Sequence, residues 1–423
     1  MNNADGLLLT QFVNYGLKRF DLGLLVSGVV CGRAQPEIPG RSVVLSLVLG
    51  EVAHVPSFLQ LQAETQLPQW QRWVGYAGAI SDDTFGYVSE RLDPEQLRRA
   101  ARYIHRKLKR GKAFEASKIK GLLCVSLDAN EQFCSDHRCC EHCLTREITG
   151  KNAAGQEVKK TQYYHKQVYA QLSGPELSVI LDFEPLRQGE EECAAALRLL
   201  RRLRAAHGPR FFDVVVVDAW YANGPFLKTV VAELGWPVIA VLKQERFEVH
   251  QEALALSRKK PDQVVERQGR RLELWDIRSL RFSDSYEPPV RVVRARETWT
   301  QREQHGPAGV QLQKEQNWLW VVAGDLGGYD GAVIRDIGHS RWKIENHAFG
   351  QLTQHWHLTH CSHHHPVAVV ALLWIKLLAF TLFHAFAILH GKLYRLGKVT
   401  FQELRKRIYR SLFCGCPLRL FSG

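Results

Sequence analysis

The sequence predicts an α/β protein in which helices flank a mixed β-sheet, a helical region precedes the sheet and a β-rich insertion interrupts it. Three observations predict this fold class. Short, continuous apolar runs in the middle of the chain are typical of strands buried on both faces. Capping residues and helical periodicity dominate before residue 119. Apolar and polar residues alternate between residues 244 and 330.

The composition favours an anionic partner. The chain has 423 residues, and 56 Lys and Arg against 43 Asp and Glu give it a net charge of +13. Such an excess most simply indicates nucleic acid, the alternative being a basic but merely solvated surface. Ten irregularly spaced cysteines in a chain of this size do not resemble a disulfide framework. No basic segment precedes the first apolar run, so we expect no signal peptide and a reducing, cytoplasmic location.

The changes of pattern divide the chain into five regions. We expect a helical, DNA-binding N-terminal region (1–118), the first part of the sheet core (119–243), the β-rich insertion (244–330), helices that complete the core (331–390) and a basic tail (391–423).

The N-terminal region is expected to reach DNA through a basic helix. Capping residues at Ser81 and Asp93 predict two helix starts, and helical periodicity follows the second. The run 98–112 is rich in Lys and Arg, as is the stretch 392–410 near the C-terminus. A solvated helix face is the alternative, but the net charge favours phosphate contacts. The first run contributes Arg98, Arg99 and Arg102.

The order of elements in the core predicts a ribonuclease-H-like fold. Apolar runs predict strands at 121–128, 163–172, 177–186, 211–218 and 236–243, with helices at 189–208 and from about 223. Three strands followed by helix, strand, helix and strand is the order of that fold. Its first and fourth strands are parallel neighbours, so their C-terminal ends adjoin, where open α/β sheets bind ligands. Those ends carry Asp128 and Asp218.

Two apolar features outside these strands have competing interpretations. The run 366–390 resembles a membrane span, but Lys376 and His384 within it favour a buried core helix and no membrane partner. Tryptophans of the insertion either pack in the core, which we expect for most of them, or offer a stacking platform for a flipped base. They are Trp275, Trp299, Trp318 and Trp320.

A third carboxylate lies in the segment 338–360. On a helix, Trp342, Phe349, Leu352 and Trp356 form one apolar stripe, and Glu345 falls inside it. A carboxylate on a core-facing stripe needs a partner, because an unpaired buried charge is very costly.

Two partners for Glu345 are open. Arg341, one turn earlier, could form an ion pair with it. Alternatively, Glu345 shares a metal with Asp128 and Asp218, and three converging carboxylates best tolerate one another around Mg²⁺ or Mn²⁺. Two such ions would activate a water or a 3′-hydroxyl in phosphodiester exchange.

The three acidic blocks resemble those of DDE-type insertion-sequence transposases that carry a β-rich insertion between the second Asp and the Glu. The blocks are "SLDANEQFCS", "VVVVDAWYANGPFL" and "HSRWKIENHAF", in this order. The resemblance covers roughly residues 80–423. It implies metal-dependent cleavage and strand transfer at the ends of a mobile element, with a homodimer acting on element ends and target DNA. It also implies metal ligation by Asp128, Asp218 and Glu345, and DNA contacts from Arg341 and Lys343.

Three positions depart from the family pattern. Ala129 replaces a usual Gly, Gly338 replaces a Tyr found in some members, and Leu352 replaces a Lys. Two other functions therefore stay open. One is a ribonuclease-H-like nuclease without strand transfer, and the other is an inactive remnant that only binds DNA.

A cluster of thiols and imidazoles follows the first acidic block. The pair Cys140 and Cys143 is typical of half a zinc site. The other half could come from Cys134 or His137 nearby, or from His165 on the next strand, and ordinary loop thiols are the alternative. The segment "SHHHP" (362–366) is expected to be a loop before the apolar helix.

Overall fold

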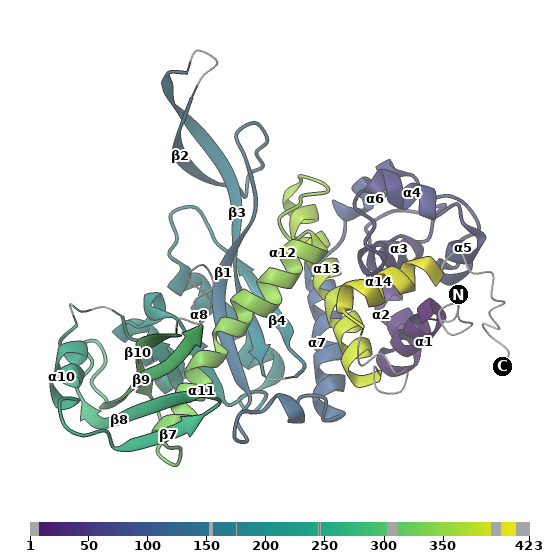
Figure 1. The fold of residues 1–423 in the computed structure, drawn as a ribbon. Coiled ribbons are helices and arrows are strands. Elements are labelled where there is room, and N and C mark those ends of the chain that lie inside the picture. The colour runs from purple at the N-terminus through teal and green to yellow at the C-terminus, as the bar shows by residue number, and fades with distance from the viewer. Residues whose placement is uncertain are drawn as a thin grey trace.

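The computed structural model describes the chain except for residues 1–7, 152–154, 175, 244, 246, 303–310, 391–398 and 412–423, and the side chains of 302, 346 and 347. Helices of the N-terminal region lie at one end of the molecule and strands of the insertion at the other (Figure 1). Between them lie the strands β1 (Cys124–Ser135), β3 (Glu157–Ser173) and β4 (Val179–Pro185). Lys392, Arg395 and Lys398 of the predicted basic tail fall outside the described residues.

The N-terminal region is helical, as predicted. Ser81 and Asp93 cap the two expected helices, accepting hydrogen bonds from the backbone N–H groups of Thr84 (3.2 Å) and Glu95 (2.9 Å). The helical segments are α1 (Leu8–Phe20), α2 (Leu22–Ser27), α3 (Gly40–Ala53), α4 (Phe58–Glu64), α5 (Pro68–Val74), α6 (Asp82–Ser89), α7 (Pro94–Arg110) and η2 (Glu115–Ser117).

The core has the ribonuclease-H-like topology. Its strands lie in the order β4-β3-β1-β5-β6; β1 is antiparallel to β3 and parallel to β5, and β5 is parallel to β6. This arrangement confirms the predicted fold class. The elements are β1 (Cys124–Ser135), β2 (Leu144–Lys151), β3 (Glu157–Ser173), β4 (Val179–Pro185), α8 (Glu192–His207), β5 (Val214–Val217), η3 (Ala219–Tyr221), α9 (Gly224–Lys228), η4 (Thr229–Glu233) and β6 (Val238–Val241).

The first core strand is longer than the sequence suggests. We predicted that it ends at Asp128, whereas β1 continues to Ser135, paired with β3 all along. β3 in turn pairs with β2, a strand that the prediction lacked, and the two project from the body as a long hairpin (Figure 1). The prediction failed because polar residues such as Asn130 and Glu131 interrupt the apolar run while the backbone stays extended.

The insertion continues the core sheet instead of forming a separate module. β10 pairs antiparallel with β6, and β9, β8 and β7 follow in order. Trp275 and Trp320 are buried, which confirms core packing for these two. Trp318 stacks on Trp320 at 6.0 Å, and the Arg270 guanidinium lies 4.3 Å from the Trp299 ring. The elements are α10 (Glu248–Leu256), β7 (Gln263–Arg267), β8 (Arg270–Leu280), β9 (Val290–Arg302) and β10 (Gln311–Ala323).

Helices after the insertion complete the core. The long apolar helix α13 is buried over 78% of its most apolar stretch, so the prediction of a core helix is confirmed. Its Lys376 contacts both Glu51 oxygens and the Trp356 carbonyl at 2.7 Å, which satisfies the buried ammonium. The segments are α11 (Gly331–Ser340), η5 (Ile344–Phe349), α12 (Gly350–Trp356), α13 (Pro366–His390) and α14 (Phe401–Arg410).

Candidate active site

The register of two parallel strands brings Asp128 and Asp218 together. Ser126 of β1 lies opposite Val216 of β5, and each aspartate follows two residues later on its own segment. β5 ends at Val217, whereas β1 continues, so Asp128 faces the edge at which its neighbour stops. The negative charge of Asp218 acts on the Asp128 carboxyl, as its effect on the pKa of that group shows.

Asp218 also has a local structural role. Its Oδ1 accepts a hydrogen bond from the backbone N–H of Trp220 at 2.8 Å and so caps the 3₁₀ turn η3. Because this hydrogen bond uses only Oδ1, Oδ2 of Asp218 remains available as a metal ligand. Capping and metal ligation are therefore compatible. An asparagine would preserve the cap but remove the charge.

Glu345 reaches the same site through an irregular helical turn. It belongs to η5, a π-helical segment, and the exposed fraction of its side chain is 45%. The predicted placement within a buried apolar stripe is therefore wrong, although Leu352 and Trp356 are buried as expected. A π-helical turn holds more residues than an α-helical one, so the helical phase shifts at Glu345; such turns are frequent at functional sites.

Arg341 joins two of the carboxylates. Its Nη1 lies 2.6 Å from Glu345 Oε1 and 3.5 Å from Asp128 Oδ2. The ion pair considered from the sequence is thus present, and it also draws in the strand aspartate. Arg341 itself is buried, with an exposed side-chain fraction of 6%.

The charge of Arg341 does not fully compensate this cluster. The pKa of Asp128 is raised to about 7: burial raises it most, the charges of Glu345 and Asp218 add to that rise, and Arg341 offsets part of it. Protonation of the Asp128 carboxyl is therefore favoured, and a cation bound next to it would be favourable for the same reason. The donors are carboxylate oxygens, the ligands that Mg²⁺ and Mn²⁺ prefer, so the residues fit a divalent-metal site.

The three departures from the family pattern have structural explanations. Ala129 is a regular strand residue opposite Val168, where glycine is not required. A Cβ atom on Gly338 would lie 2.4 Å from Trp320 Nε1, so a larger residue cannot occupy this position without displacing the indole. Leu352 is fully buried, and a lysine there would be costly.

Most of the basic residues predicted to bind DNA have internal partners. Arg98 is buried and lies 3.2 Å from Asp182, so its assignment to phosphate contact is wrong for this structure. Arg99 is exposed, with Asp93 at 3.8 Å, and remains a candidate. Arg102 is partly buried. Near the C-terminus, Arg405 is buried and donates to the Glu51 and Val52 carbonyls.

Two residues near the carboxylates have side chains suited to DNA. Lys343 is half-buried and donates to the Gly174 carbonyl at 2.7 Å, so a phosphate would have to compete for it. Trp220 is 59% exposed, lies in the η3 turn that Asp218 caps, and was not among the residues predicted from the sequence. The signal that could have identified Trp220 from the sequence is its position, two residues after a candidate catalytic aspartate.

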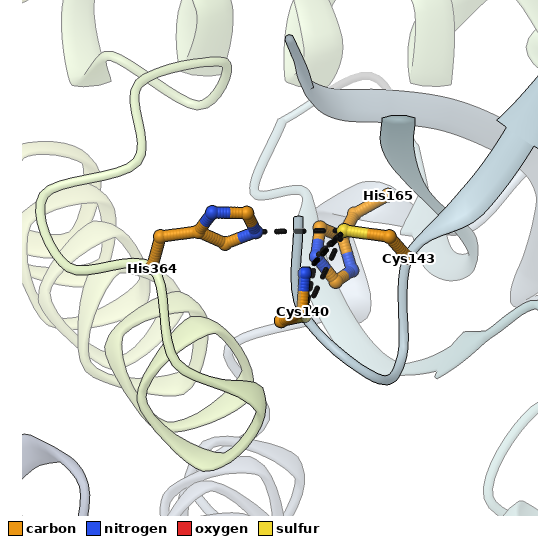
Figure 2. A group of neighbouring side chains, drawn as sticks. All are labelled: Cys140, Cys143, His165 and His364. Carbon is orange, nitrogen blue, oxygen red and sulfur yellow. Dashed lines mark hydrogen bonds between the residues drawn. The ribbon is translucent and has the colours of Figure 1, made fainter. Parts of the chain in front are cut away.

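A second group of metal-type ligands lies beyond the strand aspartate (Figure 2). Donor atoms of Cys140, Cys143, His165 and His364 all lie within 4.8 Å of one another. Burial lowers the pKa of His165 to about 4 and also lowers that of His364, so both rings are neutral at pH 7. Burial raises the pKa of the Cys143 thiol to about 11.

The composition of this group corrects the sequence prediction. Cys134 and His137 are exposed and lie outside it. His165 was one of the alternatives, and the cysteine pair is present as expected. His364 was missed; it belongs to "SHHHP", which is a loop as predicted but also supplies a donor.

One family model and one solved structure resemble this chain. A family model described as a transposase DDE domain matches residues 136–382, more than half of the chain; the match begins after Asp128 and includes Asp218 and Glu345. A cryo-EM structure of the piggyBac transposase synaptic complex with hairpin DNA is similar over 94% of this chain and 79% of that chain, with 12% identity and a TM-score of 0.44. No curated protein matches the sequence. The family match shows that the chain belongs to the transposases with a DDE domain.

Proposed function

We propose that this protein is an active DNA transposase that cleaves DNA at the ends of its own mobile element and joins those ends to target DNA. The proposal rests on the grouping of three carboxylates: Arg341 joins Asp128 to Glu345, and the charge of Asp218 acts on Asp128. The family membership supports it, because the reaction is the one such domains are named for. DNA, both as element end and as target, is the proposed partner.

The three carboxylates would hold divalent metal, Mg²⁺ or Mn²⁺. Two such ions supply an activated water or 3′-hydroxyl and stabilise the leaving oxygen. In the first reaction a water oxygen bonds to phosphorus as the bond to the 3′-oxygen breaks, and the 3′-oxygen takes up a proton. In the second reaction that 3′-hydroxyl attacks a target phosphodiester, whose own bond to a 3′-oxygen breaks.

The other side chains would orient DNA at this site. Arg341 is buried and its Nη1 contacts both Asp128 and Glu345, so it would bind a DNA phosphate only by exchanging one of these partners for it. The exposed ring of Trp220, adjacent to the Asp218 turn, could stack on a base near the cleaved bond. These contacts would place the scissile phosphate without contributing ligands to the metal.

The substitution Asp218→Asn tests the proposal. It preserves the cap on Trp220 but removes the charge, so DNA binding and folding should persist while cleavage and joining fall at least about a hundredfold in Mg²⁺. Asp128→Asn and Glu345→Gln should behave alike, and double variants should lose little more, since the ligands act as one unit. The assay measures cleavage and strand transfer on DNA that bears the element's ends.

The control is Asp284→Asn, which changes a carboxylate with an exposed fraction of 92% in the insertion and should retain full activity. Near wild-type turnover of Asp218→Asn that still requires Mg²⁺ would refute the assignment. Cleavage without any joined product would instead indicate a nuclease. DNA binding indifferent to Mg²⁺, with neither reaction, would indicate an inactive remnant.

A further inference from the structure

We propose that Cys140, Cys143, His165 and His364 bind one structural zinc ion. This ion cross-links the strand region that carries Asp128 to the helical region that carries Glu345. The proposal concerns metal content and chain architecture. It can therefore be tested independently of the catalytic function.

The spacing of the donor atoms matches tetrahedral zinc. Cys140 Sγ and Cys143 Sγ are 3.7 Å apart, and His165 Nε2 is 3.4 Å from each sulfur. His364 Nε2 is 3.5 Å from Cys143 Sγ. Bonds of about 2.3 Å to sulfur and about 2.0 Å to nitrogen in a tetrahedron require edges of about 3.3–3.8 Å. The four separations given above lie in this range before any metal is added, and the other two are within 4.8 Å.

The local structure holds these donors in place (Figure 2). The Cys143 N–H donates to the Cys140 carbonyl at 3.0 Å, and the Cys140 N–H donates to Cys143 Sγ at 3.3 Å, which forms a tight turn around the sulfurs. His165 lies opposite Phe133 in the β1–β3 ladder, and the His364 ring packs 4.9 Å from the Phe133 ring. Hydrogen bonds to sulfur and fixed imidazole rings are typical support for a metal site.

The donor set favours zinc in a closed, structural site. Two sulfurs and two imidazole nitrogens in tetrahedral arrangement suit zinc better than the hard ions expected at the carboxylates. Four protein donors leave no position for a reacting water, which distinguishes a structural site from a catalytic one. A cavity of ≈ 450 Å³ lined by Cys143, His165 and Pro366 gives an ion access to the cluster. The sulfur separation is far longer than the roughly 2.05 Å of a disulfide.

The donors come from segments that are remote in the sequence. Cys143 and His364 are 221 residues apart. The cysteine pair follows β1, the strand that carries Asp128, whereas His364 follows α12, the short helix directly after the Glu345 turn. A metal at this point would therefore fix the end of one ligand-bearing segment against the end of the other. Closing so long a loop stabilises the folded state by restricting the unfolded chain.

Metal content provides the first test. Wild-type protein purified under reducing conditions should contain about one zinc ion per chain, and Cys143→Ser and His364→Gln should lose it. Cys134→Ser and His137→Ala are matched controls from the same segment and should retain it, because both residues lie outside the cluster. Co²⁺-substituted protein should show the intense visible absorption of tetrahedral thiolate coordination, which His364→Gln should alter.

Hydrogen exchange provides the second test and addresses the cross-link between the two regions. Removing zinc from wild-type protein with a chelator should accelerate exchange in residues 341–364 as well as in the cysteine turn, and adding Zn²⁺ back should reverse both effects. Folded wild-type protein without zinc, or loss of zinc from Cys134→Ser, would overturn the site. Zinc loss that accelerates exchange only in the cysteine turn would contradict the proposed cross-link. Neither measurement depends on DNA cleavage, so failure here is distinguishable from failure of the proposed function.

Discussion

Two carboxylate clusters of this protein differ in how their charge is compensated. Glu297, on β9, is buried and contacts Arg335 Nη2 at 2.6 Å and His339 Nε2 at 3.0 Å. Burial alone would raise the pKa of Glu297, but these partners lower it to about 2. Asp128 is also largely buried and has a single arginine beside it, and its pKa is raised to about 7.

The difference distinguishes a structural carboxylate from a candidate metal ligand. Around Glu297, two arginines face one carboxylate, so its negative charge is neutralised within the protein. Around Asp128, Arg341 contacts two carboxylates and the charge of Asp218 acts on the same point, so the protein leaves negative charge to be compensated from outside. A divalent cation is the partner that such a deficit favours.

The largest effect on stability is expected at Glu297. Glu297→Gln should lower the free energy of unfolding by about 3 kcal/mol at pH 7, because Arg335 and Arg270 lose a buried counter-charge. The folded-state pKa of Glu297 is depressed to about 2, so the wild-type advantage is complete above about pH 4.5 and disappears as the pH falls toward 2. Denaturant unfolding of wild type and Glu297→Gln at pH 7 and at pH 3 measures this stability difference at each pH.

A matched control is Glu315→Gln, which removes an exposed carboxylate from the neighbouring strand β10 and should change stability by less than about 0.5 kcal/mol. A Glu297→Gln deficit that is equal at both pH values would contradict the charge-compensation explanation. Asp128→Asn should show the opposite pattern at neutral pH, with little loss of stability.

A smaller effect is expected from two adjacent arginines of α7. Arg98→Ala should destabilise the fold by about 2 kcal/mol, because Asp182 loses a buried partner, without changing the salt dependence of DNA binding. Arg99→Ala should leave stability within about 0.5 kcal/mol but reduce the slope of DNA affinity against salt concentration by about one unit. If Arg98→Ala reduces the slope at unchanged stability, the internal role of Arg98 is wrong.

The sequence predicted the features that depend on strand order. Asp128 and Asp218 could be paired because each follows a buried apolar run, and the topology makes those runs parallel neighbours. The "RWKIEN" block identified Glu345, but the helical period placed it on the buried face. Periodicity could not reveal the π-helical turn, which shifts the helical phase and leaves the Glu345 side chain 45% exposed.

The sequence could not predict contacts between remote segments. His364 joins the cysteine pair across 221 residues, and nothing in "SHHHP" distinguishes it from its neighbours. In fact His363 pairs at 2.8 Å with Glu90, the residue that directly follows α6. Likewise, Arg98 and Arg99 look equivalent in the sequence, and only the position of β4 makes one internal and the other exposed.

Manganese binding tests most directly whether Asp128, Asp218 and Glu345 are metal ligands or only an ion-paired cluster around Arg341. The measurement is Mn²⁺ titration of zinc-loaded protein bound to an element end, followed by calorimetry or paramagnetic resonance. Wild type and Cys134→Ser should bind Mn²⁺, whereas Asp128→Asn and Asp218→Asn should lose that binding while still holding the DNA. Mn²⁺ binding by Asp218→Asn with wild-type affinity and stoichiometry would contradict the metal site.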